Sequence, residues 1–294
     1  MNGSDRRLYK FSGPTEYALQ NLERGVIFCQ HYSAYNDPFE FWSNVQEGAP
    51  NPHKEPERFM AAKKAWGAER MPDDDEYLVE FFDACVEEQP SFRKWRESTR
   101  IACFGSEPDN LLMWSHYADG LRGFCLVFDD TEILEASPRS SFAVDVTYVD
   151  APPNADAFVY AICSELIDYN EMAIGEAESQ AKHRGKIDPF LEDHRKDLER
   201  SILGWQEIMQ MVFATKPIDW SYEAERRLLV QASTESHDPL FLSYPSTALR
   251  EVLIGERMSV TFRDRLGEII SKAYPEVLVR TAKRSPSKFR LEIK

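Results

Sequence analysis

The sequence lacks the motifs of the common nucleotide-handling and hydrolytic enzymes. Its 294 residues contain no G-x-x-x-x-G-K-[ST] phosphate loop, no G-x-G-x-x-G turn and no G-x-S-x-G nucleophile. These absences count against an ordinary kinase, a Rossmann enzyme and an α/β-hydrolase. No internal repeat and no low-complexity tract is present either.

Cysteines are few and are poorly spaced for metal or disulfide chemistry. The five are odd in number, with no C-x-x-C pair and no Cys/His spacing typical of zinc. We therefore expect buried, reduced thiols, with neither a structural zinc ion nor a disulfide. Cys103 and Cys125 are expected on adjacent strands without a bond between them.

Positive charge is scarce relative to negative charge. Lys and Arg total 35 against 50 Asp and Glu, which gives a net charge of −15. This balance disfavours nucleic acid as a partner. No apolar run approaches the length of a membrane span or has the form of a signal peptide, so we expect a cytoplasmic protein without membrane association. The three acids at 73–75 are expected in the solvated first turn of a helix rather than at a metal.

Apolar residues make up 43% of the chain and follow the periodicities of both strands and helices. Strand-like runs recur from residues 8–11 to the closing 289–293, and two helical excursions occupy about 45–98 and 154–212. Strands flank both excursions and no Gly/Ser/Pro-rich linker separates two halves. We therefore expect one α+β domain over residues 1–294, centred on a single sheet. Hairpin signals are scarce, so the strand order stays open.

Residues 101–129 combine strand, short helix and strand around a dense set of reactive side chains. Asp109-Asn110 is a natural helix N-cap, and Gly120 and Gly123 bracket the exit. Between them lies the sequence MWSHY, whose side chains can stack, donate and titrate. Such a helix either fills the hydrophobic core or forms the wall of a pocket. Its histidine, His116, is accordingly either a hydrogen-bonded core residue or part of a site.

The clearest acidic pattern is E-x-E-x-R within residues 220–232. If this stretch is a strand, Glu223, Glu225 and Arg227 project to one face. Two carboxylates about 7 Å apart raise the pKa of at least one of them unless a cation intervenes, and Arg227 is such a cation. Either the pair is an acid–base site, or it is a salt bridge on a solvated strand face.

Several of these motifs occur together in a known family. LYKF, NDPFE, ACFG, NLLMWSHYADGLRGFCLVFD, VTYVD, K-x-x-x-W-x-Y-E-x-E-x-R and LREVLIGERMS follow one another over about residues 8–260. In this the chain resembles the bacterial domain-of-unknown-function family 2971. The family has no settled activity. The resemblance implies a remote similarity to the ADP-ribosyltransferase fold with its split sheet, and a place near mobile elements and phage-defence genes.

The resemblance also implies roles for particular residues. Glu225 would contact the ribose 2′-hydroxyl of NAD and Glu223 would assist it, so this pair is catalytic. Tyr9 and Lys10 stand where ADP-ribosyltransferases carry His or Arg, and Gly105 stands where the family more often has serine. The implied substrate-binding residues are Tyr9, Lys10, Asn36, Asp37, Trp114, His116, Tyr117 and Arg227.

Three functions remain open at this stage. The first is an NAD- or nucleotide-processing effector, either ADP-ribosyltransferase-like or an NAD hydrolase, in phage defence or a toxin system. Its substrate would be NAD, its partner a protein target or another defence protein, and no metal is expected. The second is a metal-dependent nuclease or phosphohydrolase with Asp37, Glu40, Glu223 and Glu225 as ligands. The third is a non-catalytic sensor or interaction module. For the first we expect Asn36-Asp37, residues 114–117 and the glutamate pair to line one cleft.

Overall fold

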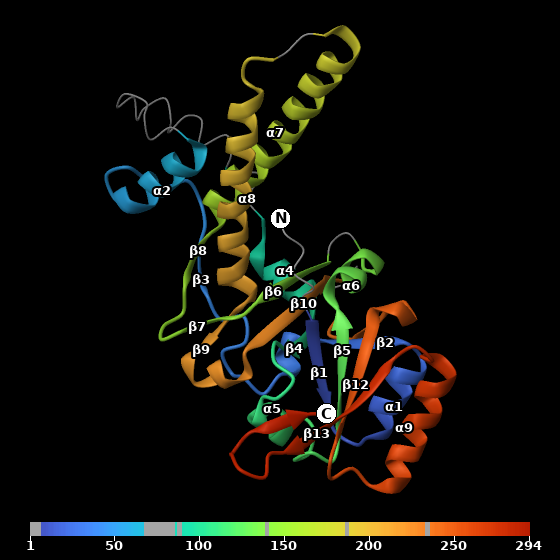
Figure 1. Cartoon of the computed structure of the whole chain (residues 1–294). Helices are drawn as coiled ribbons and strands as arrows, with labels where there is room; N and C mark the ends of the chain where they lie inside the picture. The colour runs from blue at the N-terminus through green and yellow to red at the C-terminus, as the bar shows by residue number, and fades with distance from the viewer. Residues whose placement is uncertain (1–6, 68–85, 87–89, 139–140, 186–187, 233–235) are drawn as a thin grey trace. The chain divides into compact units, whose positions relative to one another are not determined.

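The protein has an α+β fold, as the sequence predicts. A computed structural model describes residues 7–67, 86, 90–138, 141–185, 188–232 and 236–294 (Figure 1). Contacts within the chain group it into two compact units. The first comprises Met1–Glu40, Lys94–Asp150 and Lys216–Lys294, and the second comprises Phe41–Arg93 and Ala151–Thr215. The expected helix that starts at the acids 73–75 lies outside the described residues. Among the described helices, none is long and apolar enough to cross a membrane.

The first unit is built on a mixed sheet in which neighbouring strands are mostly antiparallel. Along its main path the order is β11-β2-β4-β1-β5-β12-β13-β14, and β10 pairs with both β4 and β6. Within this sheet, the only parallel pair among the described strands is β12 with β13. The strands are β1 (Arg7–Ser12), β2 (Val26–His31), β4 (Thr99–Gly105), β5 (Phe124–Asp129), β6 (Ser141–Asp145), β10 (Glu225–Gln231), β11 (Leu240–Ser243), β12 (Leu249–Gly255), β13 (Leu278–Arg284) and β14 (Leu291–Ile293). Two short strands, β7 (Thr147–Val149) and β9 (Thr215–Pro217), pair with each other.

Strand β4 forks the sheet. One of its edges is paired along its whole length with β10, from Glu225 opposite Gly105 to Gln231 opposite Thr99. The other edge pairs with β2 at the start of β4 and with β1 at Gly105. Between these two contacts the strands β1 and β2 diverge, and this opening is where a pocket forms.

Alternation along the strands packs both faces of the sheet. In β5, Phe124, Leu126 and Phe128 join a core with helices α1 (Glu16–Glu23) and α9 (Val260–Ala273), which lie side by side in Figure 1. Cys125 and Val127 face the other way, into a smaller core that includes Trp114. That tryptophan belongs to α5 (Leu111–His116), which Asn110 caps by accepting from two backbone N–H groups, as the sequence predicts. A further helix, α6 (Asp130–Ala136), follows β5 directly.

The second unit is largely helical. Helices α7 (Ala157–Arg184) and α8 (Leu191–Phe213) pack against each other, and α2 (Pro56–Trp66) packs against α7 (Figure 1). Phe59 meets Phe158 and Ile162 in a shared apolar cluster. A two-stranded parallel sheet of β3 (Asn44–Gln46) and β8 (Asn154–Asp156) completes the unit. Helix α4 (Phe92–Ser98) runs from the end of one unit into the other.

Two sequence predictions about the sheet are wrong. Residues 220–232 do not form one strand, because Ile218–Glu223 is a 3₁₀ helix (η3) and Ala224 has a left-handed φ of 43°. The strand starts at Glu225, so Glu223 is not on its face. Cys103 and Cys125 are not on adjacent strands, because β1 lies between β4 and β5. Both thiols are free, and so are Cys29 and Cys163.

Candidate functional site

A pocket of about 340 Å³ opens in the first unit where β1 and β2 diverge from β4. Pockets of this size commonly hold small ligands. Aromatic rings and polar groups share its wall. The lining residues are Tyr9, Lys10, Phe11, Phe28, Gln30, Ala34, Tyr35, Asn36, Cys103, Phe104, Met113, Tyr117, Lys216, Glu223 and Glu225.

Lys216 bridges the two glutamates at the pocket. Its Nζ lies 2.7 Å from Glu223 Oε2 and 2.8 Å from Glu225 Oε2, and all three side chains are buried. It also lies over the ring of Trp220, 5.0 Å from the centroid. The Lys216 ammonium therefore offsets the repulsion between the two carboxylates, the role that the sequence assigned to Arg227.

Arg227 lies behind Glu225 and ties it to a third carboxylate. The guanidinium donates from Nε to Glu225 Oε1 at 2.9 Å and from Nη2 to Glu40 Oε2 at 2.9 Å. A second contact, from Nη1 to Glu40 Oε1, is 2.7 Å long and makes the pair with Glu40 bidentate. Glu40, Lys216, Glu223, Glu225 and Arg227 together form what we call the carboxylate–cation cluster.

The cluster keeps Glu225 ionised at neutral pH. Burial by itself would raise the pKa of Glu225, but Arg227 and Lys216 outweigh it and hold the pKa at about 2. Burial would likewise lower the pKa of Lys216, and the two glutamates raise it instead. For Glu40 burial prevails, so its pKa lies above the ordinary value despite Arg227. Repulsion therefore does not make Glu225 more basic, contrary to the sequence-based expectation.

The turn between η3 and β10 is held from two sides, which fixes Glu223 beside Glu225. Asn110 donates from its side-chain amide to the carbonyl of Tyr222 at 2.6 Å. Ser106 donates to the carbonyl of Ala224 from its backbone N–H and from its hydroxyl, at 3.1 and 2.6 Å. The left-handed Ala224 thus brings two carboxylates from different elements to one pocket wall.

Two tyrosine hydroxyls contact the glutamates, and of these two residues Tyr117 lines the pocket. Tyr117, the residue that caps the C-terminus of α5, donates its hydroxyl to Glu223 Oε1. The backbone N–H of Glu225 donates to the Tyr148 hydroxyl at 2.8 Å. Burial and the hydrogen bond to Glu223 raise the pKa of Tyr117, so it stays a neutral donor.

The structure brings six of the proposed site residues to this pocket. They are Tyr9, Lys10, Asn36, Tyr117, Glu223 and Glu225. Lys10 donates to the carbonyl of Cys103 at 2.9 Å and lies over the ring of Phe104. Their catalytic and binding roles stay predictions.

Four other proposed residues do not line the pocket. Trp114 is fully buried, and its indole N–H donates to the carbonyl of Pro108 at 2.8 Å, so it cannot stack on a ligand there. His116 is exposed and packs beside Tyr222. Asp37 is buried and accepts from the backbone of Phe39, which stabilises the turn after Asn36. Arg227 lies in the interior behind Glu225.

Lys216 and Tyr148 are the site residues that the motifs did not single out. Both were visible in the sequence, as the first residue of K-x-x-x-W-x-Y-E-x-E-x-R and as the tyrosine of VTYVD. A lysine seven residues before a glutamate would lie about 10 Å away along a helix and on the opposite face of a strand, so neither element predicts the contact and only the folded chain shows it.

The protein is thus of the α+β class, with a forked mixed sheet and a buried carboxylate–cation cluster at a pocket. The comparison with protein families gives one match. The model described as "Protein of unknown function (DUF2971)" matches residues 113–228, which confirms the resemblance over this stretch. The matched stretch includes α5, Lys216 and the glutamate pair. Neither a curated protein nor a solved structure matches the chain, and the similarity to ADP-ribosyltransferases stays a prediction.

Proposed function

We propose that the pocket binds a nucleotide of the NAD class and that the protein cleaves its nicotinamide–ribose bond, as an NAD hydrolase or an ADP-ribosyltransferase. The observation that carries this proposal is the convergence of Glu223 and Glu225, from η3 and β10, on a wall shared with aromatic rings. Tyr9, Phe28 and Tyr117 offer ring surfaces on which a base or a nicotinamide ring can stack.

The electrostatics of the cluster suit this reaction. Cleavage of a glycosidic bond passes through a state in which positive charge develops on the sugar ring. A carboxylate that is ionised throughout stabilises that charge, provided that it is already in place. Glu225, with a pKa of about 2, meets the requirement at neutral pH. In this proposal Glu225 accepts from the ribose 2′-hydroxyl and acts electrostatically rather than as a base.

Glu223 differs from Glu225 in its partners. It contacts Lys216 on one oxygen and the Tyr117 hydroxyl on the other. We assign to Glu223 the positioning of the attacking water or acceptor nucleophile. The family resemblance extends the proposal to a cytoplasmic effector in phage defence or a toxin system.

The metal-dependent alternative is less well supported by this site. A divalent ion between Glu223 and Glu225 would have to displace Lys216, which lies within 2.8 Å of both carboxylates. Glu40 is engaged by two nitrogens of Arg227. The non-catalytic alternative fits the same contacts, because a fully paired cluster can simply stabilise the fold. Activity measurements separate it from our proposal.

The test incubates purified protein with NAD and measures the nicotinamide that is released. Chromatography quantifies the product. We expect turnover by the wild type and a loss of at least about a hundredfold in Glu225→Gln, the usual scale for a positioned catalytic group. Glu268→Gln, a change at an exposed position of α9, is the matched control and should leave the rate unchanged. Circular dichroism melting reports whether each variant is folded.

A second variant covers the case in which Glu225→Gln fails to fold. Tyr117→Phe keeps the ring and removes only the hydroxyl that contacts Glu223, and it should lower turnover about tenfold or more, as expected for a lost positioning hydrogen bond. Absence of both NAD binding and nicotinamide release in the folded wild type would refute the proposal. So would full activity in a folded Glu225→Gln protein.

A further inference from the structure

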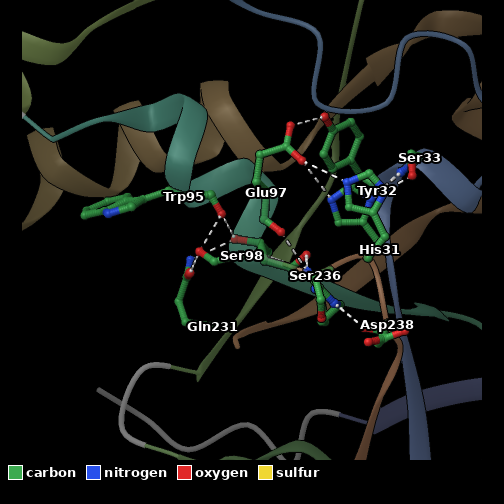
Figure 2. A network of polar contacts seen from close by, with 12 residues as sticks. His31, Tyr32, Ser33, Trp95, Glu97, Ser98, Gln231, Ser236 and Asp238 are labelled. Atoms are coloured by element: carbon green, nitrogen blue, oxygen red, sulfur yellow. Dashed lines mark hydrogen bonds and ion pairs between the residues drawn. The ribbon is translucent and has the colours of Figure 1, made fainter. Parts of the chain in front are cut away.

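Three side chains that could bind a metal meet on the first unit, and none of them lines the pocket. His31 ends β2, Glu97 lies in the last turn of α4, and His237 lies between β10 and β11. Figure 2 shows Glu97 pointing toward His31 from α4, with Tyr32 and Ser33 around them. The ligating atoms of the three residues all lie within 4.8 Å of one another.

Two of the three separations match those in a tetrahedral metal site. His31 Nε2 lies 3.4 Å from Glu97 Oε2, and His237 Nε2 lies 3.3 Å from the same oxygen. Ligands that bind zinc at about 2.0–2.1 Å with tetrahedral angles are separated from one another by about 3.3–3.4 Å. The two imidazole rings are stacked with centroids 4.0 Å apart, and the His237 side chain is exposed, so metal binding by both rings requires that the His237 ring turn out of the stack.

His31 provides an independent sign that a ligand belongs here. The side chain is buried, and its Nε2 makes no hydrogen bond among the residues that the structure describes, although Glu97 Oε2 lies 3.4 Å away. A buried polar atom without a partner costs free energy unless something else binds it.

Neighbouring groups orient two of the ligands as outer-shell residues do in metalloproteins. Ser33 holds the His31 ring at Nδ1, with its Oγ at 2.7 Å and its backbone N–H donating at 3.3 Å, and this contact orients Nε2 toward Glu97. The Tyr32 hydroxyl donates to Glu97 Oε1 at 2.8 Å and leaves Oε2 for an ion. Both partners come from the short 3₁₀ helix η1 (Tyr32–Ala34) that follows β2.

The backbone holds the third ligand in place. Pairing of β11 with β2 brings Leu240 opposite Cys29, which carries the preceding residues toward His31. Arg100, fully buried and opposite His31 on β4, donates from its guanidinium to the carbonyls of Ser236 and Asp238, on both sides of His237. The segment that carries His237 is therefore anchored through its backbone, and its ring contacts both Glu97 and His31.

We propose that His31, Glu97 and His237 form a binding site for one transition-metal ion of the zinc class. Two imidazoles and one carboxylate suit zinc and its neighbours and do not suit calcium or magnesium, which prefer oxygen ligands alone. Three protein ligands leave a fourth position, which a water molecule fills in such sites. Because His237 is largely exposed, that position faces solvent. This inference departs from the expectation of a metal-free protein and does not depend on the proposed function.

The test uses untagged, full-length protein stripped of metal with a chelator and then titrated calorimetrically with zinc. We expect one equivalent to bind, with affinity reduced by at least about tenfold in His237→Ala and in Glu97→Gln. Cobalt in place of zinc should give the visible absorption of a tetrahedral site. His183→Ala, which removes an exposed histidine of α7, is the matched control and should bind as the wild type does.

Two results would overturn the proposal. One is a folded, metal-free wild type that binds neither zinc nor cobalt, which would make the trio a hydrogen-bonded histidine–glutamate group only. The other is unchanged zinc affinity in a folded His237→Ala protein, which would place the ion elsewhere. Tyr32→Phe gives a finer check, because loss of an outer-shell donor should weaken binding about tenfold without removing a ligand.

Discussion

Replacing Lys216 by methionine tests the central contact of the candidate site. Lys216→Met keeps most of the length of the side chain and removes the ammonium that lies 2.7 Å from Glu223 and 2.8 Å from Glu225. Two buried carboxylates then face each other without the cation between them. Arg227 still contacts Glu225, and Tyr117 still donates to Glu223, so compensation is partial rather than absent.

The expected cost follows from the burial of these groups. Removing one partner of a buried ion pair typically destabilises a protein by about 3–5 kcal/mol. The pKa of Glu225 gives a similar figure, because its fall from 4.5 to about 2 corresponds to about 3 kcal/mol at 1.36 kcal/mol per unit. Since Arg227 remains, we expect the lower end of the range. For a unit of this size, about 3 kcal/mol lowers the melting temperature by about 6–12 °C.

The direction in which the stability loss changes with pH distinguishes loss of the Lys216 charge from a packing defect. In the wild type the pKa of Glu225 is depressed, so its stabilisation is present above pH 4.5 and is lost as the pH falls from 4.5 toward 2. In Lys216→Met the pKa of one carboxylate should rise, because repulsion and burial are no longer offset. The stability deficit relative to the wild type should then be smaller at pH 5 than at pH 8.

Urea and thermal unfolding at the two pH values measure this effect. Lys272→Met, at an exposed position of α9, is the matched control and should change the free energy of unfolding by less than about 0.5 kcal/mol. A Lys216→Met protein as stable as that control at pH 8 would refute the reasoning. A deficit that grows toward pH 5 would also refute it, since it would trace the loss to packing or another charge.

Two further predictions concern the scaffold of the site. Gly123→Ala should prevent stable folding, because an added Cβ would lie 2.0 Å from the carbonyl oxygen of Ser12, and the yield of soluble, cooperatively melting protein measures this. A Gly123→Ala protein with the yield and melting behaviour of the wild type would show that the backbone near Ser12 can shift to accommodate the Cβ. Asn110→Ala should cost about 1–2 kcal/mol, because it removes both the cap of α5 and the bond to Tyr222, and chemical unfolding measures this. A cost below about 0.3 kcal/mol would mean that neither bond contributes.

Local patterns in the sequence predicted most elements of the sheet. Alternation placed β1, β2, β4, β5 and β12 close to their observed positions, because a strand with one or two buried faces shows its period directly. Asn110 marked the start of α5 for an equally local reason, since the cap acts within three residues. The prediction failed at 220–224, where charged alternation resembles a strand and nothing in the residue types announces a left-handed alanine.

The sequence by itself determined the α+β class, the elements and the residue types available for chemistry, because these follow from interactions over a few neighbouring residues. Tertiary structure decided the fork of the sheet at β4, and with it the pocket. It also decided that Lys216 lies between the two glutamates, and that His31 and His237 meet across Glu97, which is 140 residues from the second histidine. Such contacts depend on strand order and register, which are set by the packing of the whole core and leave no trace in the spacing of the residues involved.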